Sequence, residues 1–253
     1  MRILLTILVL YSILWTCTSL QETGSFLHIT DVFWRRRNDS CAKNLDECVK
    51  HSLNRLLQKS KEYHPSFVMW SCAGGRRAPT VIKLMKEVFK DMMILPALPP
   101  VKLPASKKNL AYYRNISNYF GNWLDNEARK TFWKTGYYTR FLKTPKDLQV
   151  IVLNTAFFCS FHVLSELDDP AGQWTWLVLE LMKAKRMNKK VYLLMSATPD
   201  AFNISNDRTF VAKHYDRYIN VVQTFSDVIK GQFGGYEDAE KFHLITDKAG
   251  NNV

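Results

Sequence analysis

Apolar residues along the chain follow two alternating patterns. Short apolar runs are typical of buried strands, and longer stretches with apolar residues at helical spacing are typical of helices that pack on a sheet. The predicted strands are residues 26–30, 67–70, 94–95, 148–153, 191–195 and 242–246. The predicted helices cover residues 45–57, 81–89, 171–187 and a long segment around 218–225. This alternation predicts an α/β layered domain.

The first twenty residues break this pattern. Arg2 precedes an apolar run over residues 3–15, which is shorter than the ~20 residues that a membrane-spanning helix needs. Small residues at Cys17 and Ser19 suit a cleavage site, so we predict a secretory signal peptide over residues 1–19 and a single domain over residues 20–253. The alternative is an uncleaved membrane anchor. No other apolar stretch reaches spanning length, so we expect an exported protein, secreted or lysosomal, with no integral membrane span.

The chain is basic. Its 253 residues include 35 Lys or Arg and 23 Asp or Glu, which gives a net charge of +12 that falls to +11 when residues 1–19 are removed. A positive surplus attracts anionic partners through salt-sensitive contacts. We therefore expect anionic lipid head groups, sulfated glycans or nucleotides as ligands. The sequence contains no recognisable nucleic-acid module.

Two basic runs are candidates for phosphate contacts. Gly74-Gly75-Arg76-Arg77 precedes a predicted helix, so its amides and guanidinium groups could face a phosphate. Arg35-Arg36-Arg37 follows the first predicted strand. For both runs the alternative is a solvated turn without a ligand.

Export also changes the interpretation of the cysteines, because disulfides persist in an oxidising compartment. Cys41 and Cys48 lie seven residues apart across a polar turn and form the predicted disulfide. Cys72 and Cys159 lie in apolar or aromatic runs and are interpreted as buried thiols. Three Asn-X-Ser triplets agree with export and give candidate glycosylation sites at Asn38, Asn115 and Asn203.

Several short segments, in a fixed order, carry a resemblance to a known family. They are residues 26–31 (FLHITD), 121–124 (GNWL) with 137–138 (YY), 153–155 (LNT), 169–173 (DPAGQ) followed by 176–177 (WL), and 231–233 (GQF). In sequence and order they resemble the acid sphingomyelinase-like phosphodiesterases of the calcineurin-like metallophosphoesterase superfamily. The resemblance covers residues 26 to about 246 and implies an αββα layered sandwich.

The resemblance also implies hydrolysis of phosphodiesters at a two-metal centre, usually of zinc. In such a centre a carboxylate bridges two cations about 3.5 to 4 Å apart, His and Asn complete the coordination, and bound water becomes the nucleophile. Carried over position by position, Asp31 is the sole surviving ligand, and Asp238 stands at the last His position as a weak candidate. The other ligand positions hold Phe33, Ala73, Pro100, Val101, Ser196 and Tyr236.

The histidines do not fill these gaps. All six lie elsewhere, at positions 28, 51, 64, 162, 214 and 243. His28 belongs to the first predicted strand and is interpreted as a packed or hydrogen-bonded strand residue. A shift of the alignment by one residue supplies no His near positions 73, 101, 196 or 236.

Two hypotheses therefore remain open. The first is a secreted pseudoenzyme that has lost its two-metal centre, holds no cofactor and acts as a binding protein for anionic ligands. The second is an active, zinc-dependent hydrolase of sphingomyelin-like lipids or nucleotides, with a site rebuilt from Asp31, Asn154, Glu237 and Asp238. The resemblance further implies a C-terminally short domain, incomplete in its C-terminal sheet, whose exposed strand edge favours self-association.

Overall fold

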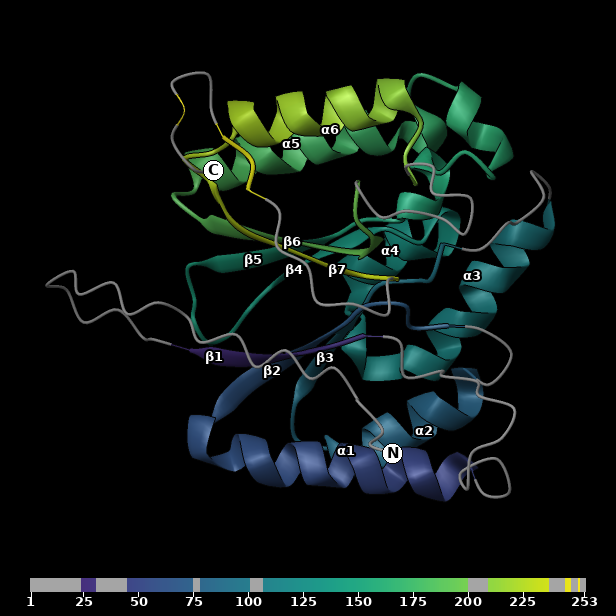
Figure 1. Cartoon of the computed structure of the whole chain (residues 1–253), viewed down its shortest axis with the longest axis vertical. Coiled ribbons are helices and arrows are strands. Elements are labelled where there is room, and N and C mark those ends of the chain that lie inside the picture. The colour runs from purple at the N-terminus through teal and green to yellow at the C-terminus, as the bar shows by residue number, and fades with distance from the viewer. Residues whose placement is uncertain are drawn as a thin grey trace, which may run out of the picture.

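The protein has a mixed α/β fold in which two sheets lie between layers of helices (Figure 1). The computed structural model describes residues 24–30, 45–74, 78–100, 107–199, 209–236, 244–246 and 250. Helices cover the outer side of each sheet, and the inner sides face each other. The predicted αββα layering is confirmed. No helix within these ranges is long and apolar enough to cross a membrane.

The first sheet is parallel, with the strand order β1-β2-β3. Its strands are β1 (Ser25–Ile29), β2 (Pro65–Trp70) and β3 (Met93–Pro96). Its outer side carries α1 (Leu45–Ser60) and α2 (Ala78–Val88), at the bottom of Figure 1. Val68, in the central strand, pairs with Leu27 on one side and Ile94 on the other, and all three are buried.

The second sheet has the strand order β4-β5-β6-β7, with β4 antiparallel and the other pairs parallel. Its strands are β4 (Tyr138–Phe141), β5 (Leu148–Val152), β6 (Lys190–Ala197) and β7 (Ile229–Gly235). Its outer side carries α5 (Gln173–Arg186) and α6 (Ala212–Thr224), at the top of Figure 1. Every residue of β5 is buried, as expected for a parallel strand covered on both faces.

Two helices beside the sheets, α3 (Lys107–Phe120) and α4 (Asn126–Thr135), were not predicted. Asp125 caps α4 by accepting a hydrogen bond from the Ala128 amide, and Gly136 ends it with a φ of 76°. A Cβ at Gly136 would come within 3.0 Å of Asn154 Nδ2, so this turn needs glycine for space as well as for backbone conformation. Short 3-10 turns complete the chain: η2 (Lys61–Tyr63), η3 (Gly121–Trp123), η4 (Thr155–Phe158), η5 (Val163–Glu166) and η6 (Pro170–Gly172).

The C-terminal part of the chain differs from the prediction in two of its strands. Residues 231–235, which lie outside the predicted strands and helices, belong to strand β7. The predicted strand 242–246 is wrong in its described part, because residues 244 and 245 are in no strand and Thr246 forms only an isolated bridge. Leu244 is 76% exposed, so this apolar run is not buried as a core strand would be. The Thr246 carbonyl instead accepts a hydrogen bond of 2.7 Å from Gln223 Nε2 of α6.

The two sheets meet through aromatic rings and through a close approach at the end of β7. The Phe26 ring of the first sheet lies 5.2 Å from the Phe233 ring and 5.6 Å from the Tyr192 ring of the second. At Gly235, a Cβ would clash with the Thr30 side chain and lie 3.1 Å from Ser71 Cβ. The three strands β1, β2 and β7 therefore end in close contact, with space for glycine alone.

We expect Gly235→Ala to destabilise the protein by about 2 kcal/mol, because the added methyl group overpacks the contact with Thr30. Thr30→Ala removes the nearest atom, so the double variant should be more stable than the sum of the single effects. Urea unfolding of the four proteins measures this coupling. Strict additivity would contradict the described junction.

Candidate functional site at the carboxyl ends of the strands

The carboxyl ends of the strands gather at one edge, where ligands bind in α/β folds. The Ala73 amide donates to the Ala97 carbonyl at 2.7 Å, which joins the ends of β2 and β3. Cys72 Sγ lies 3.9 Å from the Ser196 carbonyl, which joins the ends of β2 and β6. Tyr236 follows the Gly235 junction, has a φ of 79° and is partly exposed.

Part of the predicted set lies beyond what the structure describes. Ala73, Pro100 and Ser196 are buried at this edge. Asp31, Phe33, Val101, Glu237 and Asp238 lie outside the described residues. Their part in any site stays a prediction.

A buried hydroxyl, that of Ser71, bridges the two sheets at this edge. Ser71 Oγ donates to the Met195 carbonyl at 3.0 Å and lies 2.9 Å from His28 Nε2. Because the single hydroxyl proton goes to Met195, His28 must donate from Nε2. Burial lowers the pKa of His28 to about 4, so the imidazole is neutral near pH 7. His28 is thus a hydrogen-bonded strand residue, as interpreted from the sequence.

The end of β6 is likewise hydrogen-bonded to a hydroxyl group of the protein, that of Thr155. Thr155 Oγ1 accepts a hydrogen bond of 3.1 Å from the Ala197 amide and lies 3.3 Å from Ser196 Oγ. At the end of β2, a Cβ on Gly74 would come within 2.5 Å of Pro99 Cδ, so the backbone there packs directly on proline. The described strand ends therefore contain neutral hydroxyl groups and apolar contacts rather than charged ligands.

The described residues at the strand ends do not by themselves fit a two-metal centre. Such a centre needs a bridging carboxylate and several neutral His or Asn ligands to hold two dications close together. Among the residues that the structure describes, no group of three or more His, Cys, Asp or Glu is placed to hold a metal ion. The hydroxyl groups of Ser71 and Ser196 lie within hydrogen-bond distance of protein partners.

Asn154, a candidate for the rebuilt site, is held by structural hydrogen bonds. Its Nδ2 donates to the Tyr113 hydroxyl at 3.0 Å and to the Thr135 carbonyl at 2.8 Å. Its main chain is clamped by Gln173, whose Oε1 accepts from the Asn154 amide at 2.7 Å and whose Nε2 donates to the Asn154 carbonyl at 3.1 Å. Asn154 thus joins β5 to α5 and to the α4 turn.

The segment 169–173 builds the start of α5. The Asp169 carboxylate accepts hydrogen bonds from the Trp174 amide at 2.7 Å and the Thr175 amide at 3.2 Å. Ala171 and Gly172 adopt left-handed φ values of 54° and 70°, which turn the chain into the helix. The Tyr137 hydroxyl donates to the Ala171 carbonyl at 2.9 Å. Three of the segments that carry the family resemblance, 137–138, 153–155 and 169–173, are therefore connected to one another.

Sequence reasoning found these segments but missed their role. Gln173 and Tyr138 were quoted only as parts of the resemblance, with no role assigned, although Tyr138 donates to the Pro96 carbonyl at 3.0 Å and so joins the second sheet to the first. The available signal was the Asp-Pro pair ahead of a helical pattern, which is typical of a capped helix start. Nothing in the local pattern shows that the following Gln would bind a main chain nineteen residues earlier.

The remaining predicted residues divide between described and undescribed parts. Cys72 and Cys159 are buried and form no disulfide bond, which confirms their interpretation as buried thiols, and burial raises the pKa of Cys159. Cys48 takes part in a disulfide bond. Its predicted partner Cys41 lies outside the described residues, so that pairing stays a prediction. Asn115 is exposed on α3. Asn38, Asn203 and the arginines at positions 35–37, 76 and 77 lie outside the described residues.

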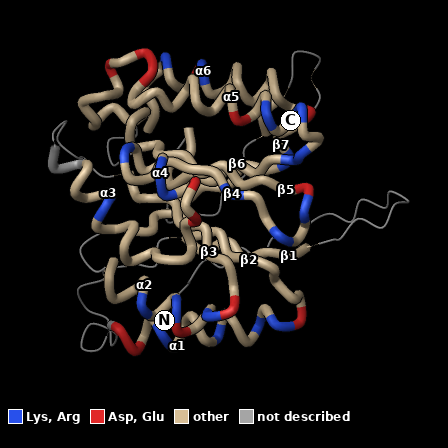
Figure 2. The backbone as a smooth tube through the Cα atoms, turned by 180° about the vertical axis from the view of Figure 1, so that it is seen from behind, with Lys and Arg blue, Asp and Glu red and all other residues tan. Residues whose placement is uncertain are grey.

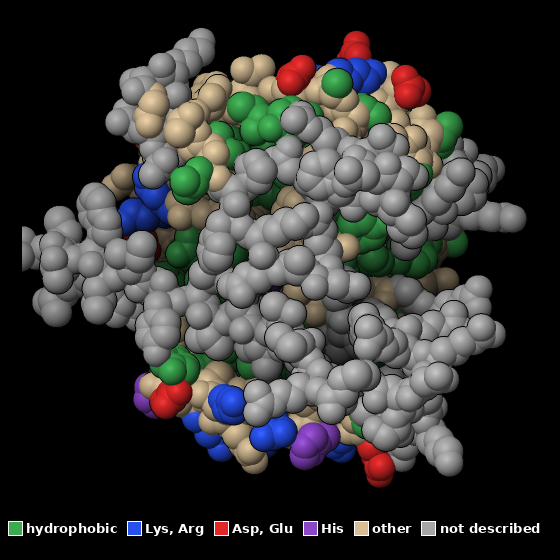
Figure 3. All heavy atoms as spheres, in the orientation of Figure 1, with side chains coloured by type: hydrophobic (Ala, Val, Ile, Leu, Met, Phe, Trp, Pro, Cys, Tyr) green, Lys and Arg blue, Asp and Glu red, His purple; other side chains and the backbone are tan. Residues whose placement is uncertain are grey.

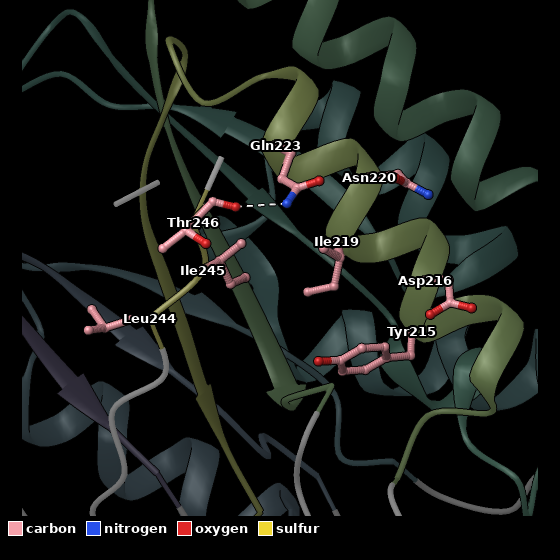
Figure 4. Close-up of a pocket in the computed structure, with 8 residues that line it drawn as sticks. All are labelled: Tyr215, Asp216, Ile219, Asn220, Gln223, Leu244, Ile245 and Thr246. Atoms are coloured by element: carbon pink, nitrogen blue, oxygen red, sulfur yellow. Dashed lines mark hydrogen bonds between the residues drawn. The ribbon is translucent and has the colours of Figure 1, made fainter. Parts of the chain in front are cut away.

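A separate groove of about 530 Å³ lies between α6 and residues 244–246 (Figure 4). Its described lining is Tyr215, Asp216, Ile219, Asn220, Gln223, Leu244, Ile245 and Thr246. Asp216 is acidic and none of these residues is Lys, Arg or His. The described lining therefore offers no counter-charge to an anionic ligand.

We expect His28→Gln to reduce the loss of stability at acid pH. Unfolded His28 binds a proton near pH 6.5, whereas folded His28 binds it only near pH 4, so its contribution is complete above pH 6.5 and is lost as the pH falls towards 4. This amounts to about 2 kcal/mol between pH 7 and pH 5. Denaturant melts across this range measure it, with the exposed His51→Gln of α1 as control. Equal slopes for the wild type and His28→Gln would contradict the described environment.

We expect Gln173→Ala to cost about 2 kcal/mol, because it leaves the buried amide of Asn154 without a partner and its carbonyl with only the 3.4 Å hydrogen bond from the Phe157 amide. The exposed Gln58→Ala on α1 is the matched control and should be neutral. Urea unfolding provides the measurement. A loss below about 1 kcal/mol would mean that water replaces the clamp.

Comparison with known proteins finds similar proteins that are named as phosphodiesterases. No family model matches the chain. It is 27% identical to the human cyclic GMP-AMP phosphodiesterase SMPDL3A over 217 residues, which are 77% of this chain and 48% of that protein. It is also 27% identical to human acid sphingomyelinase-like phosphodiesterase 3b, over 76% of this chain and 47% of that protein. Sphingomyelinase phosphodiesterase C of Dictyostelium discoideum is 25% identical over 78% of this chain and 50% of that protein.

The fold has a counterpart among solved structures. A dimetal phosphatase from Danio rerio superimposes with a TM-score of 0.55 at 12% identity, over 90% of this chain and 85% of that one. The chain spans about half the length of the curated relatives it matches. The chain is thus similar in sequence to the acid sphingomyelinase-like phosphodiesterases and has the metallophosphoesterase fold.

Proposed function

We propose that the protein is an exported relative of these phosphodiesterases that has lost the two-metal centre and acts as a binding protein for anionic ligands. The observation that carries the proposal is the neutral, hydrogen-bonded packing at the strand ends. Ser71 joins His28 to Met195, and Ser196 lies against Thr155. Where the resembled family places a bridging carboxylate, this chain has the buried methyl group of Ala73.

The physical argument concerns charge. Two dications placed in a buried site need several anionic ligands, because an uncompensated buried charge is strongly unfavourable. Neutral hydroxyl and methyl groups do not supply that compensation. The segments shared with the family instead serve the architecture, since Asn154, Asp169 and Gln173 all make structural hydrogen bonds. The fold can therefore persist without the metal centre.

The binding part of the proposal rests on the net charge of +12. Phospholipid head groups, sulfated glycans and nucleotides are anions that such a surface attracts, and binding should weaken as salt is added. Binding, unlike hydrolysis, also needs no metal-bound water as a nucleophile. Self-association through a strand edge is a further part of the proposal, because β7 ends the described order of the second sheet and is only partly buried.

The alternative is hydrolysis of sphingomyelin-like lipids or nucleotides through Asp31, Asn154, Glu237 and Asp238, with zinc. The names of the relatives favour it. Against it, the Asn154 amide nitrogen already donates to Tyr113 and Thr135.

Metal analysis and enzyme assay separate the two functions. We expect the purified secreted protein to contain no stoichiometric zinc and to leave a chromogenic phosphodiester intact when zinc is added. It should bind heparin or anionic vesicles in a salt-dependent way. Stoichiometric zinc with turnover that Asp31→Ala abolishes would overturn the proposal.

Restoring the missing carboxylate gives a second test. We expect Ala73→Asp to destabilise the protein by several kcal/mol, because the new carboxylate is buried without a partner. Ala97→Asp, at the equally buried end of β3, is the matched control. Thermal unfolding with and without zinc should show that zinc rescues neither variant. Selective rescue of Ala73→Asp would show that a working ligand set remains around position 73.

A further inference from the structure

Helix α5 carries apolar side chains on both of its sides. One side packs on the second sheet and buries Trp174, Leu177, Leu181 and Ala184. On the other side Leu179 is 58% exposed and Met182 is 48% exposed, and Met187 just past the helix is 49% exposed. Single exposed apolar residues are normal on a protein surface, whereas a contiguous group marks an interaction site.

These exposed side chains are contiguous. At 100° per residue, positions 179, 182, 183, 186 and 187 fall within an arc of about 140° on the helix. Phe141, exposed at the end of the edge strand β4, extends the group, because Lys183 Nζ lies 5.7 Å from the centre of its ring. We call this group the α5 surface: Phe141, Leu179, Met182, Lys183, Arg186 and Met187.

Basic residues surround one end of the α5 surface. They are Lys143, Lys146, Lys183, Lys185, Arg186, Lys189 and Lys190. Lys185 pairs with Asp227 at 2.9 Å and Lys190 pairs with Asp147 at 3.6 Å. Within the described chain the other five have no acidic partner. Figure 2 shows blue segments at the end of α5 and before β5 on the same side of the molecule.

Helix electrostatics alone do not explain this arrangement. Lys and Arg in the last turn stabilise a helix through its dipole, but exposed Leu and Met do not. Other faces differ in charge. Val163 and Leu167 are also exposed, yet Glu166 and Asp168 lie among them. Along α1, at the lower edge of Figure 3, acidic and basic side chains are mixed.

We propose that the α5 surface docks on a bilayer that contains anionic lipids. Leu179, Met182 and Met187 enter the boundary between head groups and acyl chains, and the basic side chains extend to the phosphates. A sulfated glycan would use the charges but leave the apolar tips in water, so the observations favour a bilayer. The proposal rests on the anion-binding part of the proposed function and is independent of the metal centre.

Vesicle sedimentation tests it with the full-length secreted protein. The probes are phosphatidylcholine vesicles with and without phosphatidylserine. We expect binding only with phosphatidylserine, and at least about tenfold weaker partition for Lys183→Glu/Arg186→Glu, since each basic residue near the membrane contributes about fivefold and two of them are reversed. Leu179→Gln/Met182→Gln should also weaken binding at least severalfold. All four positions are exposed, so the variants should fold, which thermal melts verify.

Two matched controls give the contrast. Val163→Ser/Leu167→Ser removes exposed apolar groups from another face, and Lys90→Glu/Lys134→Glu reverses exposed charges elsewhere. Both should bind nearly as the wild type does. Binding that is equal for neutral vesicles, or unaffected by the α5 variants, would overturn the inference. Heparin binding without vesicle binding would overturn it while leaving the proposed function intact. Zinc-dependent turnover with intact vesicle binding would overturn the proposed loss of the metal centre and leave this inference standing.

Discussion

The hydroxyl of Ser71 holds together the edge on which the rest of the fold depends. It directly follows β2, accepts a hydrogen bond from His28 of β1 and donates to the Met195 carbonyl of β6, so one small group joins both sheets. The direction of both hydrogen bonds is fixed, because the hydroxyl has a single proton and the Met195 carbonyl can only accept. A neutral His28 follows from this arrangement and from its burial. In a metallophosphoesterase fold this edge is the usual location of chemistry, and the described part of it is filled by the protein's own interactions.

The segments that resemble the family form mainly a framework in this chain. Asp169 caps α5, Gln173 clamps the main chain of Asn154, and Tyr138 reaches from the second sheet to Pro96 of the first. The contacts of Gln173 and Tyr138 join elements that are distant along the sequence. Their loss would affect folding whether or not the protein turns over a substrate. A family resemblance carried by such segments is therefore strong evidence for the fold and weak evidence for the reaction.

The sequence predicted the layered fold because its central strands are almost uniformly apolar. Leu148–Val152 form a fully buried strand, and the spacing of Leu53 and Leu56 identifies the buried side of α1. Strand β7 escaped prediction because its glycines lack β propensity, and only close contacts in the fold explain them, such as those of Gly235 with Thr30 and Ser71. The run 242–246 was misjudged because its apolar composition suits a strand, although Leu244 is left in solvent. The bridging role of Ser71 depends on contacts across the sheets, which no local pattern reports.

The glycine at the end of α4 has a consequence for how this protein can change over evolutionary time. Gly136 combines a left-handed φ with three neighbours within 3.0 Å, so almost any replacement would disturb the fold. Positions such as Ala73 and Ser196 tolerate small neutral residues once no cation has to be held. Under the proposed function, selection for folding alone would thus preserve the turn, while the positions that hold metal ligands in the resembled family drift. A lineage can in this way keep a recognisable architecture long after its chemistry has ceased to constrain it.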